Sequence, residues 1–188
     1  MRRVFLGLLL AFSISVSAHE GHGAELLSVA LHPFTGWDHL LAMLLVGVLM
    51  AKYPRKEGWL IPVAFVTAFS VGLFSGSIIS GAQIPLNVNY FVWGSLIIFS
   101  VALLMKKLPS IFAMSALAAF FGMSHGVVHG EELVLVNSGY YLGLIGATAL
   151  LHLIGFATST FLEQKFNLAL KAFIVVSGLA GLVAIVAA

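Results

Sequence analysis

The sequence contains no cysteine. Disulfides, thiolate metal sites, haem attached through cysteine and lipoprotein anchoring are therefore excluded, and a metal site must use nitrogen, oxygen or thioether ligands. Charge is also scarce, since only 9% of the 188 residues are Asp, Glu, Lys or Arg. In such a chain, an ionisable side chain inside an apolar segment needs a functional explanation.

Apolar side chains, in contrast, are abundant: 61% of the residues are hydrophobic and the mean hydropathy is +1.09. Both values lie far outside the range of soluble globular proteins. The chain is therefore predicted to be a membrane protein with the lipid bilayer as a partner. The sequence pI of about 9.1 does not indicate a nucleic-acid partner, because the Lys and Arg residues stand in small groups between apolar runs, as topology signals do.

The first 18 residues have the three parts of a secretory signal peptide. A basic start, Met1 to Arg3, precedes a short apolar centre and a small-residue cleavage site that ends at Ala18. The centre is too short for a comfortable transmembrane helix. We therefore expect cleavage after Ala18, with His19 as the mature N-terminus outside the cytoplasmic membrane; an uncleaved signal anchor is the alternative. Residues 19–33 would then form a histidine-containing leader on the outer side.

Six apolar segments follow this leader, each near the roughly 20 residues that a bilayer requires. Residues 34–188 are therefore expected to form one all-α, polytopic membrane domain, a bundle of six transmembrane helices. The predicted spans are Phe34 to Ala51, Trp59 to Ser80, Asn89 to Met105, Pro109 to His129, Gly139 to Leu162 and Leu168 to Ala187.

Charged residues between the spans predict the orientation of the bundle, because Lys and Arg accumulate on the cytoplasmic side. With the mature N-terminus outside, every Lys and Arg after Ala18 falls inside and none falls outside. The outer connection between the fourth and fifth spans instead carries Glu131 and Glu132, which we interpret as a solvated loop that attracts cations. The cytoplasmic residues are Lys52, Arg55, Lys56, Lys106, Lys107, Lys165 and Lys171.

Small residues in three spans predict where helices pack closely, since lipid offers no hydrophobic drive for helix association. A direct functional role is the less favoured interpretation of these positions. They are Gly72 and Gly76 in the second span, Gly143 and Ala147 in the fifth, and Gly178, Ala180 and Gly181 in the sixth.

The predicted orientation brings most histidines to one side of the membrane. The outer end of the first span and the outer end of the fourth span are both rich in metal-ligating side chains. In the fourth span, His125 and His129 are one helical turn apart and so lie on one face. The candidate metal ligands are His32, Asp38, His39, His125 and His129, and weaker candidates are His19, His22, Met43, Glu132 and His152.

Spacing within the first cluster limits how it can bind an ion. Pro33 suits the first position of a helix, so we expect Asp38 and His39 between one and two turns inside it. Adjacent residues on a helix point about 100° apart. Both could therefore bind one ion only between helices, or Asp38 could instead orient an imidazole. Imidazole, carboxylate and thioether donors without thiolate suit a borderline divalent ion such as Ni, Co, Cu or Zn.

Simpler structural explanations also exist for some of these residues. A single histidine at a membrane interface is more often a snorkelling or capping residue, which applies to His22 and His32. Met43 is better explained by packing. His152 lies deepest, within the fifth span, and is a candidate for a later step of a pathway rather than for the outer layer.

The stretch from His32 to Gly47, H-P-F-T-G-W-D-H-L-L-A-M-L-L-V-G, resembles the signature of the HupE/UreJ family of hydrogenase and urease accessory membrane proteins. The rest of the chain is similar to the family in its signal peptide, six spans and histidine-rich fourth span. The resemblance implies a nickel or cobalt permease of the bacterial inner membrane, with residues 19–33 periplasmic. The matching signature residues are His32, Pro33, Gly36, Asp38, His39, Ala42, Met43, Val46 and Gly47.

The resemblance thus predicts a secondary permease that supplies metalloenzyme maturation, and neither an enzyme nor a holder of a prosthetic group. The sequence has no Walker-type ATP-binding loop, so transport would be facilitated or ion-coupled. The alternatives are an intramembrane metal-dependent enzyme and a metal sensor or accessory protein that does not transport. The stretch from His125 to His129 lacks the Glu of a His-Glu-x-x-His motif, which disfavours the enzyme. Whether the chain forms a homo-oligomer is left open.

Overall fold

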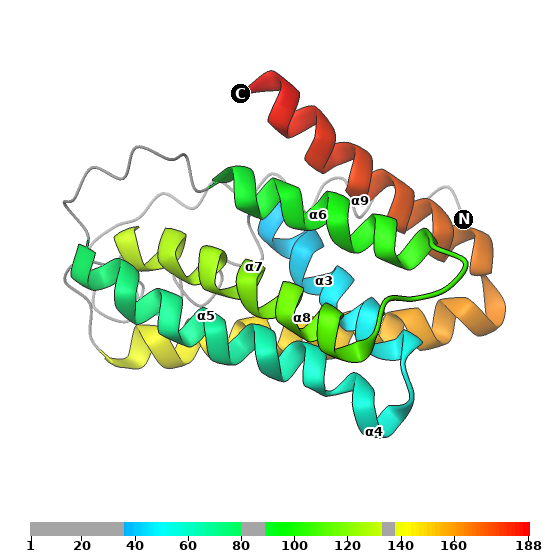
Figure 1. Cartoon of the computed structure of the whole chain (residues 1–188), viewed down its shortest axis with the longest axis horizontal. Helices are drawn as coiled ribbons and strands as arrows, with labels where there is room; N and C mark the ends of the chain where they lie inside the picture. Colours follow the sequence, from blue (N-terminus) through cyan, green and yellow to red (C-terminus); the bar gives the residue numbers. More distant parts are fainter. Residues whose placement is uncertain (1–35, 80–88, 133–137) are drawn as a thin grey trace, which may run out of the picture.

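The computed structural model describes residues 36–79, 89–132 and 138–188, and no strand occurs in these ranges. The predicted all-α class is confirmed (Figure 1). The predicted signal peptide and leader, with His19, His22 and His32, lie outside the described residues. In chain order the helices are α3 (Trp37–Lys52), α4 (Arg55–Gly58), α5 (Leu60–Ile79), α6 (Asn89–Leu104), α7 (Ile111–Glu132), α8 (Ser138–Lys165) and α9 (Asn167–Ala187).

Apart from the four-residue α4, each helix coincides with one of the six predicted spans. Four helical segments of the described ranges are long and apolar enough to cross a membrane, and α6 is a shorter apolar helix. The four segments are Arg55–Ile78, Ile111–Gly130, Tyr141–Lys165 and Asn167–Ala187.

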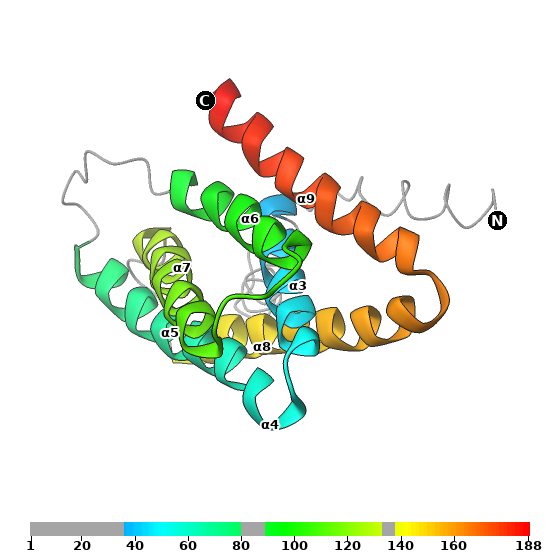
Figure 2. The ribbon, with the colours of Figure 1, turned by 45° about the vertical axis from the view of Figure 1, so that its right-hand side comes forward.

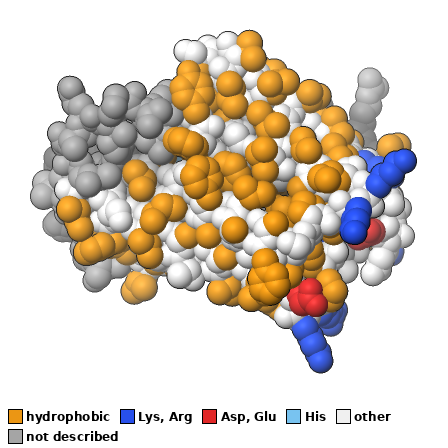
Figure 3. Space-filling view, in the orientation of Figure 1, with side chains coloured by type: hydrophobic (Ala, Val, Ile, Leu, Met, Phe, Trp, Pro, Cys, Tyr) orange, Lys and Arg blue, Asp and Glu red, His pale blue; other side chains and the backbone are white. Residues whose placement is uncertain are grey.

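The outside of the bundle is apolar, as the space-filling view shows over much of one face (Figure 3). Phe74, Phe112 and Leu168 are 65%, 75% and 83% exposed. Large continuous apolar surface is rare on soluble monomers, whereas lipid-facing helices require it. The surface and the helix lengths together define a multi-pass membrane protein.

The long helices pack as three close pairs: α3 with α8, α5 with α7, and α6 with α9. In both ribbon views α3 lies among the other helices, and it contacts members of all three pairs (Figures 1 and 2). Its side chains from Ala42 to Met50 are almost all buried. The first predicted span is therefore the central helix of the bundle.

Glycines let the backbones of α5 and α7 touch. A Cβ added to Gly126 would lie 2.7 Å from the backbone nitrogen of Leu73 and 3.0 Å from the carbonyl carbon of Gly72. Gly72 and Gly76 of α5 face the backbone of α7 in the same way, which confirms the predicted role of these two small residues. The pairing of α5 with α7 therefore depends on the absence of side chains at these positions.

Glycines also allow close contact within the other two helix pairs, α3 with α8 and α6 with α9. A Cβ at Gly47 of α3 would meet the backbone of α8, 2.6 Å from the nitrogen of Phe156. A Cβ at Gly181 of α9 would lie 2.6 Å from the carbonyl oxygen of Trp93 on α6. Close backbone approach thus holds all three helix pairs.

The structure places the start of α3 differently from the prediction. Gly36 has an extended backbone, with φ −77° and ψ 107°, and the helix begins at Trp37, not at Pro33. Asp38 and His39 are therefore in the first turn and not one to two turns inside the helix. The physical reason is a side-chain contact: Asp38 Oδ1 accepts the backbone N–H of His39 at 2.9 Å, a donor that has no partner within the helix.

The end of α7 also corrects the prediction. The helix continues through Glu131 to Glu132, so these residues form its last turn rather than a solvated loop. For Glu132, a weaker metal candidate, the structure thus describes the position of the backbone only. The helix thus continues through Gly130, because the close contact of this glycine with the α5 backbone at Leu73 and Gly76 keeps it in the packed part of α7.

Basic residues gather at one end of the bundle. Apart from Arg2 and Arg3, every Lys and Arg lies in or beside the α3–α5, α6–α7 and α8–α9 connections, which occupy the right-hand end in Figures 1 and 3. At this end Lys52 Nζ donates to Glu163 Oε1 at 2.6 Å, joining α3 to α8. The start of α3 and the end of α7 lie toward the opposite end (Figure 1).

Candidate metal-binding site

Three imidazoles from two helices meet inside the bundle. The ring of His39 on α3 lies 5.3 Å from that of His125 and 4.7 Å from that of His129, both on α7. The three residues are 8%, 0% and 3% exposed. The predicted residues of the first and fourth spans are thus brought together, and we call these three residues the imidazole cluster.

Asp38 orients the first member of this cluster. The Nδ1–H of His39 donates to Asp38 Oδ1 at 2.9 Å. The second carboxylate oxygen, Oδ2, accepts the indole Nε1–H of Trp93 on α6 at 3.0 Å. Both oxygens are therefore engaged, and of the two roles that the spacing left open for Asp38, the geometry shows the orienting contact with an imidazole.

Two further buried imidazoles are oriented by backbone carbonyl groups. His125 Nδ1–H donates to the carbonyl oxygen of Phe121, one turn earlier on α7, at 2.7 Å. His152 Nδ1–H on α8 donates to the carbonyl oxygen of Met43 on α3 at 2.9 Å. Since a carbonyl oxygen only accepts, the proton of each neutral ring must sit on Nδ1.

This leaves the Nε2 lone pairs of His39, His125 and His152 without a hydrogen-bond partner among the described residues, although all three atoms are buried. A buried polar atom left unpaired costs about 1–3 kcal/mol, so such atoms are uncommon without a function. The Nε2 lone pair of a neutral imidazole is also the donor that Ni, Co, Cu and Zn bind. The residues present therefore fit a divalent transition-metal ion as ligand or cargo.

The cluster presents its donors in pairs. Within residues 36–79, 89–132 and 138–188, no group of three or more His, Asp or Glu side chains is placed to hold one metal ion. His39 is shared between the two pairs that it forms with His125 and His129. The described residues therefore hold no closed site of three or more such ligands.

His152 lies beyond the imidazole cluster, on the other side of an aromatic side chain. The ring of Phe65 is 5.4 Å from that of His125 and 5.1 Å from that of His152. Met43, a weaker candidate ligand, is 1% exposed within the hydrophobic core, and the contact it makes with His152 is through its carbonyl oxygen. The structure thus separates one deeper imidazole from the other three.

Sequence reasoning did not identify Trp93 or Phe65. Trp93 is 55 residues away from Asp38, and Phe65 is one of 15 phenylalanines in the chain. Neither has a neighbour in sequence that marks it, since both reach the site only through helix packing.

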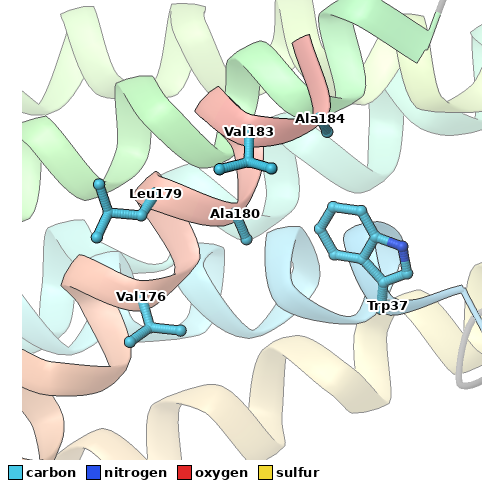
Figure 4. A pocket seen from close by; sticks show the side chains of 6 residues that line it. All are labelled: Trp37, Val176, Leu179, Ala180, Val183 and Ala184. Carbon is cyan, nitrogen blue, oxygen red and sulfur yellow. The ribbon is translucent and has the colours of Figure 1, made fainter. Parts of the chain in front are cut away.

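An apolar groove of about 480 Å³ lies elsewhere, between the start of α3 and the face of α9 (Figure 4). The indole of Trp37 faces the small side chains of Ala180 and Ala184 across it. Its lining contains no metal-ligating side chain, so this groove is a feature of the lipid-facing surface and not part of the site.

Replacing Trp93 with phenylalanine should weaken nickel binding by about tenfold, because loss of a group that orients a ligand typically costs 10–100-fold in metal affinity. The substitution keeps an aromatic ring on α6 but removes the donor to Asp38 Oδ2. Nickel titration of the purified protein in detergent measures the change. Trp59→Phe is the matched control, since Trp59 is 49% exposed and distant from Asp38 in the bundle. Equal affinities in the two variants would contradict an orienting role for Trp93.

The fold and these side chains define a multi-pass helical membrane protein with buried imidazoles oriented by a carboxylate and by backbone carbonyl groups. The chain belongs to the HupE/UreJ family, because the family model described as HupE / UreJ protein matches residues 7–185. It is 33% identical over 154 residues to Protein HupE of Rhizobium leguminosarum bv. viciae, with 78% of this chain and 76% of the relative covered. No solved structure matches the chain significantly.

Proposed function

We propose that the protein is a secondary permease that carries nickel or cobalt across the bacterial inner membrane and so supplies the maturation of metalloenzymes such as hydrogenase or urease. Membership of the HupE/UreJ family supports an accessory role of this kind rather than an enzymatic one. In this proposal all six long helices cross the membrane, after a cleaved signal peptide.

The distribution of charge supports an orientation. Lys and Arg residues gather at the end of the bundle opposite the start of α3 and the end of α7 (Figures 1 and 3). Since basic residues accumulate on the cytoplasmic side, that end faces the cytoplasm and the imidazole cluster faces the periplasm. The mature N-terminus is then periplasmic, and His19, His22 and His32 precede the cluster on the same side.

The observation that carries the proposal is the set of unpartnered Nε2 atoms on His39, His125 and His152. They are buried nitrogen donors at successive positions through the bundle, two in the imidazole cluster and one beyond Phe65. An ion that gives up water at the periplasmic end can therefore exchange it for imidazole nitrogen. Because two imidazoles bind more weakly than a closed four-ligand site, the ion can also leave, as transport requires.

The membrane potential can drive this movement without ATP. Moving one elementary charge across the membrane is worth about 2.3 kcal/mol per 100 mV, so a dication entering an inside-negative cell gains about twice that amount. The sequence has no Walker-type loop that would bind ATP. Facilitated or ion-coupled uptake is therefore the mechanism we propose.

Vesicles that contain the purified protein should accumulate radioactive nickel or cobalt faster than empty vesicles, and an inside-negative potential should increase the rate because the cargo is a dication. Uptake is followed by filtration, with release by an ionophore to distinguish ions in the lumen from ions bound to the protein. If the protein binds nickel but the lumen gains none, the proposal fails and a non-transporting metal sensor is favoured. Wild-type protein in vesicles without a potential is the matched control.

A further inference from the structure

The Phe65 ring is the side chain between the imidazole cluster and His152. It contacts His125 at 5.4 Å and His152 at 5.1 Å between ring centroids, and the residue is fully buried. The two imidazoles have no contact of their own among the described ring pairs. Phe65 is therefore the aromatic side chain that contacts both imidazoles.

Phe65 is held in place by the backbone contact between α5 and α7. A Cβ added to Gly122 of α7 would lie 3.0 Å from both the Cα and the carbonyl carbon of Phe65. The Phe65 ring also packs on Phe69, whose own ring is 5.9 Å from that of His129. The backbone of Phe65 is thus fixed, and only its side chain can move aside.

His152 also lines an open groove. A mostly apolar groove of about 270 Å³ between α5 and α8 has His152 and Thr67 in its lining, together with the exposed side chains of Trp59 and Val63. A second pocket, of about 370 Å³, lies at the basic end, shares Met50 and Trp59 with the first, and has three polar residues in its lining. Those polar residues are Tyr53, Arg55 and Thr160. His152 therefore borders open space, whereas Phe65 is fully buried.

We propose that Phe65 is a specificity-determining residue of the transport pathway, a hydrophobic barrier that admits only ions which have exchanged water for imidazole nitrogen. This inference rests on the proposed transport function. Hydrophobic constrictions exclude hydrated ions because water leaves them. Mg²⁺ loses its water reluctantly and prefers oxygen ligands, so the barrier excludes it, whereas nickel and cobalt bind the imidazoles on either side.

The test is uptake of nickel and of magnesium by vesicles that contain wild-type protein or Phe65→Ala. The wild type should take up nickel and exclude magnesium. The Phe65→Ala variant should take up nickel faster and admit magnesium, with a rise of about tenfold or more over wild type, because the dry barrier is removed. Magnesium is followed with a fluorescent indicator inside the vesicles. The Phe65→Leu variant, which removes less core volume, should change in the same direction by a smaller factor.

Phe99→Ala is the matched control. Phe99 is also fully buried, and its ring packs on Phe121, so the substitution leaves a comparable cavity but keeps the Phe65 ring against His125 and His152. If Phe65→Ala and Phe65→Leu exclude magnesium as completely as wild type and take up nickel at the same rate, the proposed barrier role of Phe65 is wrong. The transport function would remain intact in that case. If Phe65→Ala fails to accumulate in the membrane, magnesium and nickel uptake by Phe65→Leu provides the test. Absence of nickel uptake by wild type overturns the transport function, and the barrier with it.

Discussion

Replacing His39 with alanine is expected to abolish nickel uptake at trace concentration while the protein remains in the membrane. His39 is the imidazole that contacts both His125 and His129, so its loss removes a donor from each pair. We expect the affinity for nickel to fall by more than about a hundredfold, beyond the cost of losing an orienting partner alone. Nickel titration of the purified variant and uptake by vesicles measure the two effects.

Ser100→Ala is the control for this variant. Ser100 is 2% exposed, and its hydroxyl, like the Nε2 atom of His39, has no hydrogen-bond partner among the described residues. It lies in the contact between α6 and α9, beside Gly178. Nickel binding should therefore survive in Ser100→Ala. Unchanged uptake of trace nickel by His39→Ala would show that the imidazole cluster is not on the pathway.

Substitution of Gly126 by alanine should force α5 and α7 apart and sharply lower the amount of folded protein. The new Cβ would overlap the backbone of α5, at the carbonyl oxygen of Phe69 and at 2.7 Å from the nitrogen of Leu73, and backbone cannot move aside as a flexible side chain can. Overpacking of a tight contact typically costs about 1–3 kcal/mol and occasionally more. Thermal unfolding in detergent and the level of protein in the membrane measure the loss.

Gly146→Ala, on α8, should behave in the opposite way. A Cβ added to Gly146 meets nothing within 4 Å. Alanine is favoured over glycine inside a helix by about 1 kcal/mol, so this variant should be as stable as wild type or slightly more stable. Equal thermal midpoints for Gly126→Ala and Gly146→Ala would contradict the close approach of α5 and α7.

The helices could be predicted because a bilayer sets their length and composition. Each of the six apolar runs became one long helix, and Gly72, Gly76, Gly178 and Gly181 lie at helix contacts as their size suggests. The errors fell at helix ends, where local contacts decide. At the start of α3, the Asp38 carboxylate accepts a hydrogen bond from the backbone N–H of His39, a donor with no partner within the helix. The pattern of apolar residues does not reveal this contact.

The end of the bundle at which each ionisable residue lies could also be predicted. Alternation of the chain across a membrane, together with the positions of Lys and Arg, places the start of the first span and the end of the fourth on the same side. His39 and His129 consequently had to lie at one end of the bundle. Their direct contact did not follow, because helices at the same end need not be neighbours.

Helix neighbours were decided only by tertiary structure. The pairing of α3 with α8 puts the Met43 carbonyl oxygen against His152. The packing of α6 beside α3 brings Trp93 to Asp38 across 55 residues of sequence. These contacts depend on where glycines allow two backbones to touch. The sequence pattern of a helix surface does not indicate which other helix packs against it.

The sequence by itself thus determined a helical membrane protein with His39, His125 and His129 near one end and its described basic residues at the other, because bilayer length, hydropathy and charge are properties of single segments. Only the tertiary structure decided which nitrogen of each oriented imidazole is unpaired, that Asp38 holds His39, and that Phe65 stands between His125 and His152. Those properties belong to contacts between helices, and they exist only once three pairs of helices have packed around α3.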